Sequence, residues 1–169
     1  MGFISRGFRG KRRDTASSSR LPPGQYVVTD YPVLSAGPTP RIPLSEWTFV
    51  LEGEIDQPKK WTWEEFRKLP TEQVTKDIHC VTKWSKFDTV WTGVSIDTIL
   101  DGVETAAEYT VQFSYGGYTT NLIPHLYFWK SAKWIRGIRL VNEDQPGFWE
   151  VNGYNNYGDP WREQRYWGD

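Results

Sequence analysis

The stretch DIHCVTKWS, residues 77–85, contains Cys80, the only cysteine of this 169-residue chain. Residues 73–81 include several β-branched side chains, which is typical of a strand, so Cys80 lies at the end of a predicted strand. A lone thiol cannot form a disulfide within the chain. Two interpretations stay open: a small residue packed in the core, the commonest state of a free cysteine, or a thiolate that binds a metal or acts in catalysis.

Three further segments around this stretch have strand patterns. Residues 47–53 alternate large apolar side chains with others and end at a glycine, and strand-forming residues fill 109–115 and 135–141. Residues 129–134, before the last of these strands, are expected to form a loop.

Two short helices are predicted from their capping residues. Thr62 and Glu65 have the spacing of a capping box, and Pro70 ends the helix that follows. Ser95 is placed to cap a second helix over residues 96–100. Strands joined by such short helices indicate a strand-rich α+β fold rather than a regular βαβ alternation.

The amino-terminal part divides the chain into two regions. Residues 1–20 contain six basic residues, one acidic residue and no hydrophobic run, which predicts a disordered basic arm. Arg12 and Arg13 are not followed by an apolar stretch, so no export signal is expected. Residues 21–169, which begin with an extended segment rich in proline, are expected to form one domain.

The overall charge restricts the partners. Twenty basic and 21 acidic residues give a net charge of −1, so no global field attracts nucleic acid or an anionic membrane, and we expect neither as a partner. No segment has the length of a membrane span. With a single cysteine and no disulfide framework, a cytoplasmic location is expected.

Other common sites find little support in the residues. The nucleotide-binding glycine motifs are absent, and Cys80, His79 and His125 are too few for a four-ligand zinc site of Cys and His. The ten tryptophans are scattered over different elements, which favours packing, although an aromatic platform of a binding module stays open.

Several separated motifs resemble, in family order, the molybdopterin-binding domain of the sulfite oxidase family, and most closely its small soluble bacterial oxidoreductases. These motifs are DIHCVTKWS (77–85), WTGV (91–94), SYGGYTTNL (114–122) and PHLYFWKSAKW (124–134), with GFWE (147–150) and GDPWR (158–162) in the tail. The resemblance covers residues 21–169 and implies a strand-rich fold with mixed sheets and a molybdenum–molybdopterin cofactor.

The resemblance also implies roles for individual residues. Cys80 would be the catalytic residue and molybdenum ligand, because a thiolate is a soft ligand for this metal. Ser131, Ala132 and Lys133 match the small-x-Lys loop that binds the pterin and its phosphate, with Lys130 and Arg136 adding positive charge. The expected neighbours of the cofactor are His79, Thr82 and Tyr115.

The implied activity is molybdopterin-dependent oxygen-atom transfer on a small-molecule substrate such as sulfite, a sulfoxide or another small oxyanion. The chain carries no haem or flavin motif, so electrons would pass to a separate electron-transfer partner.

One departure from the family is the connection between Leu122 and Pro124, where Ile123 alone replaces a longer segment. That segment normally supplies an arginine and a polar partner, so we expect the fold to be incomplete through an internal gap. A non-catalytic relic or binding domain of the same fold is therefore an alternative. A cysteine hydrolase using Cys80 and His125 is a weaker one, since no pattern brings them together.

Overall fold

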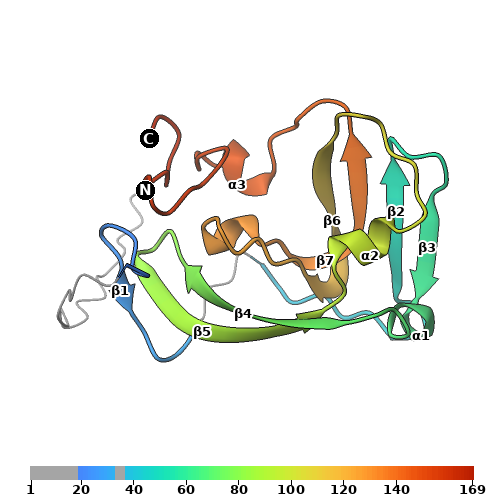
Figure 1. The fold of residues 1–169 in the computed structure, drawn as a ribbon, viewed down its shortest axis with the longest axis horizontal. Coiled ribbons are helices and arrows are strands. Elements are labelled where there is room, and N and C mark those ends of the chain that lie inside the picture. Colours follow the sequence, from blue (N-terminus) through green and yellow to red (C-terminus); the bar gives the residue numbers. More distant parts are fainter. Residues whose placement is uncertain (1–18, 33–36) are drawn as a thin grey trace.

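A computed structural model describes residues 19–32 and 37–169 (Figure 1). The predicted disordered arm over residues 1–20 thus lies outside the described residues as far as residue 18. At the end of this region the Arg20 guanidinium donates hydrogen bonds to Asp77 at 2.6 and 2.8 Å and to Asp88 at 2.6 Å. Arg20 therefore attaches the start of the described chain to the domain.

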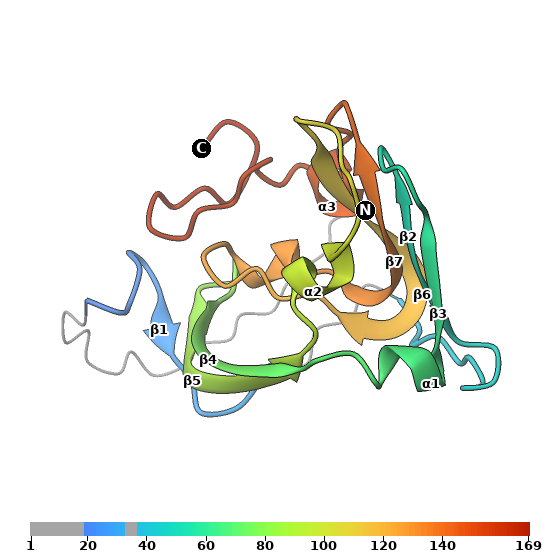
Figure 2. The same cartoon turned by 45° about the vertical axis from the view of Figure 1, so that its right-hand side comes forward.

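The strands form two mixed sheets. In Figures 1 and 2 the four-stranded sheet stands at one end of the fold, and the three-stranded sheet extends along the base toward it. One has the order β1-β5-β4 and contains β1 (Tyr26–Val27), β4 (Glu72–His79) and β5 (Trp84–Gly93). The other has the order β3-β2-β7-β6 and contains β2 (Thr48–Gly53), β3 (Lys59–Thr62), β6 (Thr110–Thr120) and β7 (Lys133–Val141). The β1–β5 and β2–β7 pairs are parallel and the others antiparallel, which confirms the predicted α+β fold with mixed sheets.

The helices are short, as predicted. They are α1 (Trp63–Phe66), α2 (Ile96–Leu100), α3 (Phe148–Val151) and the 3-10 helix η1 (Phe128–Lys130). The capping box of α1 is present, because Thr62 Oγ1 accepts from Glu65 N and Glu65 accepts from Thr62 N. Ser95 caps α2 by accepting from Thr98 N. None of the described helices is long and apolar enough to cross a membrane.

The larger core lies against the four-stranded sheet. Phe49 and Leu51 of β2 are alternate residues, as are Ile138 and Leu140 of β7, and they pack with Trp47 and α2 as strand periodicity requires. Ile135 joins this core from beyond the register irregularity of β6 and β7. The buried residues of this core are Trp47, Phe49, Leu51, Ile99, Ile135, Ile138 and Leu140.

Several parts of the observed fold differ from the sequence predictions. Strand β1 was not predicted, because its two residues lie in the proline-rich segment and pair only with β5. Strands β3 and β5 were not predicted, because lysine and other polar residues interrupt their apolar pattern and their pairing with β2 and β4 determines them. The loop expected over residues 129–134 is wrong in part, since η1 includes Trp129 and Lys130 and β7 begins at Lys133. Helix α3 was also missed.

Strand β6 continues past the predicted end at Tyr115 to Thr120. Gly117 allows this close pairing with β7, because a Cβ atom at this position would lie 1.9 Å from the carbonyl oxygen of Ile135. The β6–β7 register is irregular here, with Tyr115 and Thr119 both paired with Ile135. The glycine thus permits the strand to approach the start of β7, where the predicted cofactor loop ends.

Candidate functional site

Cys80 lies in the tight turn that joins β4 to β5. Its N–H donates to the Trp84 carbonyl at 2.8 Å, and the Lys83 N–H donates to the Cys80 carbonyl at 3.0 Å. Lys83 adopts the left-handed conformation, with a φ of 74°, that closes this turn. The backbone on both sides of the thiol is therefore fixed by a hydrogen-bonded hairpin.

The thiol is buried in the smaller core of the protein. Cys80 is 8% exposed and clusters with Ile78, Val81 and Trp84. Thr82 Oγ1 donates a hydrogen bond to the sulfur at 3.1 Å. The partly buried hydrophobic residues around the cluster are Val28, Trp91, Leu122, Phe128, Trp129 and Tyr154. Among the described residues, Thr82 is thus the one hydrogen-bond partner of this buried sulfur.

A buried polar network supports the turn from behind. His79 Nδ1 lies 2.8 Å from Ser85 Oγ, which donates to Gln25 Oε1 at 3.4 Å, and Gln25 Nε2 donates to the Cys80 carbonyl at 3.2 Å. Burial lowers the pKa of His79, and the nearby Asp77 charge opposes this shift. Sequence reasoning predicted His79 but missed Gln25 and Ser85.

Lys133, the first residue of β7, lies within electrostatic reach of Cys80. Its Nζ is 3.7 Å from the centre of the Phe128 ring and donates to the Ser131 carbonyl at 3.4 Å. Burial of the ammonium group lowers the pKa of Lys133, and a negative charge on Cys80 acts in the opposite direction. The structure thus brings together two residues that are far apart in sequence.

The rest of the predicted loop is held by the short connection after β6. Ser131 is 1% exposed, and its Oγ accepts from Ile123 N at 3.0 Å. Asn121 N donates to the Ala132 carbonyl at 3.1 Å. The connection at Ile123, which replaces the longer family segment, therefore contacts Ser131 directly, whereas Ala132 is held by Asn121 of the preceding motif.

Three other residues from the sequence analysis have different surroundings. The Lys130 ammonium pairs with Glu150, which neutralises the charge expected to add to the site. His125 is exposed, and the centre of its ring lies 6.3 Å from the centre of the Tyr157 ring. This arrangement does not support a Cys80–His125 hydrolase. Tyr115 pairs through its backbone with Ile135 in β6, and its side chain lies outside the described part of the structure.

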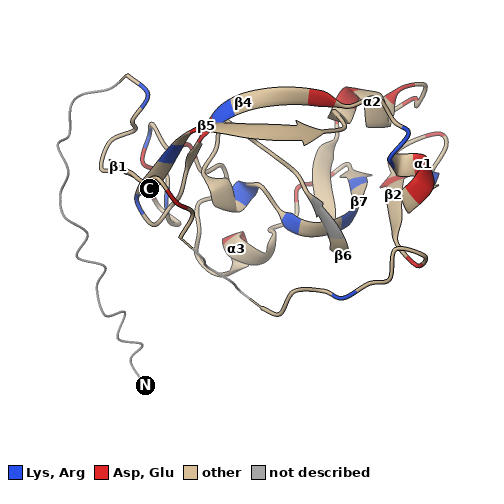
Figure 3. Cartoon of the chain, turned by 90° about the horizontal axis from the view of Figure 1, so that it is seen from below, with Lys and Arg blue, Asp and Glu red and all other residues tan. Residues whose placement is uncertain are grey.

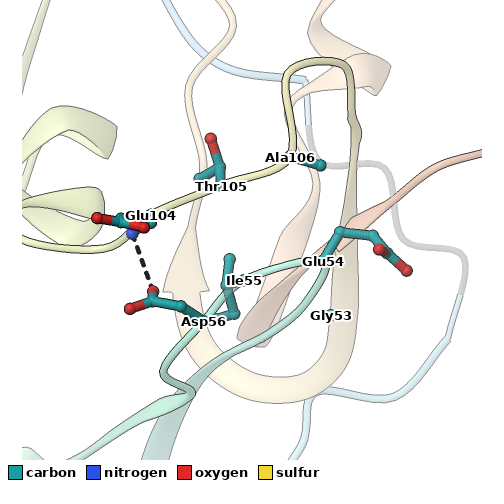
Figure 4. Close-up of a pocket in the computed structure, with 7 residues that line it drawn as sticks. All are labelled: Gly53, Glu54, Ile55, Asp56, Glu104, Thr105 and Ala106. Atoms are coloured by element: carbon teal, nitrogen blue, oxygen red, sulfur yellow. Dashed lines mark hydrogen bonds between the residues drawn. The ribbon is translucent and has the colours of Figure 1, made fainter.

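A pocket on the four-stranded sheet is a poor alternative site (Figure 4). Its lining residues are Gly53, Glu54, Ile55, Asp56, Glu104, Thr105 and Ala106. Glu104 N donates to Asp56 Oδ1 at 2.9 Å. Three carboxylates repel an oxyanion substrate or a phosphate, so this pocket does not suit the expected ligands.

The residues around Cys80 fit a molybdenum–molybdopterin group. The sulfur is a soft ligand, and the lysine ammonium suits a phosphate. Within the described residues, the indole N–H groups of Trp84 and Trp129 and the side-chain amide of Asn121 are buried without a hydrogen-bond partner. Since buried polar groups normally have partners, these groups fit a polar ligand bound beside the cluster.

Comparison with known proteins identifies the class. The sequence model of the oxidoreductase molybdopterin-binding domain matches residues 36–122, and this chain belongs to that family. YuiH of Bacillus subtilis (strain 168), named an uncharacterized oxidoreductase, is 38% identical over 195 aligned residues, covering 95% of this chain and 98% of YuiH. The resemblance to a sulfite-oxidase-type molybdopterin-binding domain and the expectation of a molybdenum–molybdopterin cofactor are thereby confirmed.

Two more distant proteins are also similar. YedZ1 of Azospira oryzae (strain ATCC BAA-33 / DSM 13638 / PS), provisionally named a protein-methionine-sulfoxide reductase subunit, is 27% identical over 64% of this chain and 54% of its own length. The sulfane dehydrogenase SoxCD from Paracoccus pantotrophus has a TM-score of 0.53 and 12% identity over 76% of this chain and 46% of its own. This chain spans about half the length of each, and the SoxCD likeness concerns the fold alone.

The comparisons also bear on the short connection. The family match ends at Leu122, where the sequence departs from the family pattern. The alignment with YuiH is 195 residues long, more than the 169 of this chain, so it contains positions at which this chain has no residue. Both observations agree with an internal segment that is missing here.

Proposed function

We propose that this protein is a molybdopterin-dependent oxidoreductase that performs oxygen-atom transfer, with Cys80 as the molybdenum ligand. The observation that carries the proposal is the buried Cys80 sulfur, which lies on a hydrogen-bonded hairpin turn and accepts a hydrogen bond from Thr82. When bound, the molybdenum–molybdopterin group supplies the redox and oxygen-transfer chemistry.

The protein residues have separate roles in this proposal. Cys80 holds the metal as a thiolate, and Thr82 donates to the sulfur, which tunes its electron donation. Lys133 attracts the phosphate of the cofactor as a point charge. Ser131 and Ala132 form the loop against the pterin. The Ser131 oxygen accepts from Ile123 N, so the hydroxyl proton is still available for donation to the cofactor.

We propose a small oxyanion or a sulfoxide as the substrate class. The name of YedZ1 supports a sulfoxide, although that relative is matched over only part of its length. Because the sequence has no haem or flavin motif, a separate electron-transfer protein would complete the cycle. The single free cysteine supports a reducing compartment, and Figure 3 shows basic and acidic residues interspersed along the chain, which gives no support for a nucleic-acid partner.

The second candidate is a relic or binding domain without a competent cofactor site. The short connection favours it, because Ile123 N occupies the Ser131 hydroxyl of the predicted cofactor loop as an acceptor. Molybdenum analysis with pterin detection separates the candidates when the protein is expressed in cells that make the cofactor. Near-stoichiometric metal supports the oxidoreductase, whereas folded protein without metal or pterin supports the relic.

A further inference from the structure

We infer that Gln25 is a positioning residue for the Cys80 turn and that it fixes the tautomer of His79 through Ser85. The positioning role rests on the proposed function of Cys80 as a ligand, whereas the tautomer belongs to the protein alone. Gln25 comes from the proline-rich segment before β1, far from Cys80 in sequence.

The geometry of the segment places Gln25 behind the turn. Tyr26 N donates to the Lys83 carbonyl at 2.8 Å, and β1 runs parallel to β5 with Tyr26 opposite Trp84. Gln25 is consequently 4% exposed, and both ends of its amide are used. A fully used buried amide specifies one arrangement of its neighbours, because each unpaired group there is costly.

The directions of the hydrogen bonds follow from one acceptor. The Cys80 carbonyl can only accept, so the Gln25 NH₂ group must face it and the Gln25 oxygen must face Ser85. That oxygen also can only accept, so the Ser85 hydroxyl gives its proton to Gln25. Ser85 Oγ then accepts from His79, which must carry its proton on Nδ1.

This hydrogen-bond network has two consequences for the candidate site. The Cys80 carbonyl accepts from both Gln25 Nε2 and Lys83 N, so the peptide that follows the ligand is held from two sides. The His79 ring presents its lone pair on Nε2 and is held in one orientation, with the Trp161 ring edge-on at 6.2 Å. Partners of this kind orient a ligand, and their loss typically costs about 10- to 100-fold in metal affinity or activity.

The test combines nitrogen NMR of the imidazole rings with molybdenum retention. The chain has only two histidines, so a His125→Gln background leaves the His79 signals alone. Wild-type protein is expected to show a protonated Nδ1 and an unprotonated Nε2. Ser85→Ala removes the acceptor for Nδ1 and should shift His79 toward the Nε2-protonated form. Gln25→Met should do the same and should also lower molybdenum retention about 10-fold or more.

Gln73→Met is the matched control, because Gln73 is an exposed glutamine of the same sheet that bonds only to Thr92 among the described contacts. It should change neither the tautomer nor the retention. A wild-type His79 protonated on Nε2, or a tautomer that neither Ser85→Ala nor Gln25→Met moves, overturns the network. Unchanged retention in folded Gln25→Met overturns its positioning role. Failure of the proposed function would give a different result. Wild-type protein would then bind no molybdenum, and the His79 tautomer would still be as expected.

Discussion

The hydroxyl of Thr82 donates a hydrogen bond to the sulfur of Cys80 over 3.1 Å. Since hydrogen bonds to a ligating sulfur reduce its electron donation, Thr82→Val should shift the molybdenum reduction potential to a more negative value. Stability should change by no more than about 1 kcal/mol, because one hydrogen bond of ordinary strength is lost. An EPR-monitored redox titration gives the potential. Thr82→Ser keeps the donor and should stay near wild type; equal shifts in both variants would contradict the assignment.

Replacing the thiol tests the ligand directly. Cys80→Ser exchanges a soft thiolate for a hard hydroxyl of similar volume, so molybdenum redox chemistry should disappear while the protein stays folded. The buried hydroxyl should cost about 1–3 kcal/mol in unfolding free energy. Metal analysis and denaturant unfolding measure the two effects. Full turnover by the serine variant would count against Cys80 as the ligand.

Lys133→Ala should weaken cofactor retention without removing the metal ligand. The ammonium lies above Phe128 and near Cys80, where it can hold a phosphate as a point charge. We expect faster loss of pterin and molybdenum together during dialysis, by about 10-fold or more. Lys60→Ala, at an exposed site on β3, is the control. Identical loss rates in the two variants would exclude the phosphate role.

Insertion of the family segment between Leu122 and Pro124 should raise molybdenum occupancy. The present connection bonds Ile123 N to the Ser131 hydroxyl, and a longer connection would release this acceptor. Metal content per folded protein is the measurement. A glycine- and serine-rich insert of the same length is the control. It frees the loop from the short connection but lacks the side chains of the family segment. Equal occupancy with and without the family segment would defeat the idea.

The Arg20–Asp77 ion pair should give an acid-dependent contribution to stability. The Arg20 hydrogen bonds hold the pKa of Asp77 below its ordinary value of 3.8. A group whose pKa is depressed on folding stabilises the protein above its unfolded pKa, and that stabilisation is lost as the pH falls through the folded pKa. Arg20→Gln should therefore lower the Tm at pH 7, and only slightly, because solvent screens an exposed ion pair.

The Tm difference between wild type and Arg20→Gln should shrink below about pH 3.8. Thermal unfolding from pH 2 to pH 7 checks this trend, with Arg67→Gln, at the exposed residue that follows α1, as a control for the loss of a surface arginine. A difference that stays constant down to the lowest pH would show that the Asp77 carboxylate is not involved.

Local sequence signals predicted the parts of the fold that depend on neighbouring residues. The Thr62–Glu65 capping box and the alternating pattern of β2 each depend on residues close in sequence, and both predictions were confirmed. Strand β5 lacked such a signal, because its pattern is interrupted and pairing with β4 on one side and β1 on the other determines it.

The same limit applies to the candidate site. Cys80, Thr82 and Lys133 could be named from motifs, but their proximity depends on how β7 begins beside η1. Gln25 could not be found, because its contact with the Cys80 carbonyl exists only after β1 has paired with β5. The prolines and the glycine before Gln25 indicate only that this segment is extended.

The close approach of Gly117 to Ile135 has a consequence for how this family of sequences can vary. Any side chain at residue 117 would collide with the Ile135 carbonyl and force β6 away from β7. Ile135 is two residues after Lys133, so the collision would displace the strand end that carries the ammonium group. A substitution at a residue with no chemistry of its own would thus disturb the predicted cofactor loop, and we expect residue 117 to tolerate glycine alone.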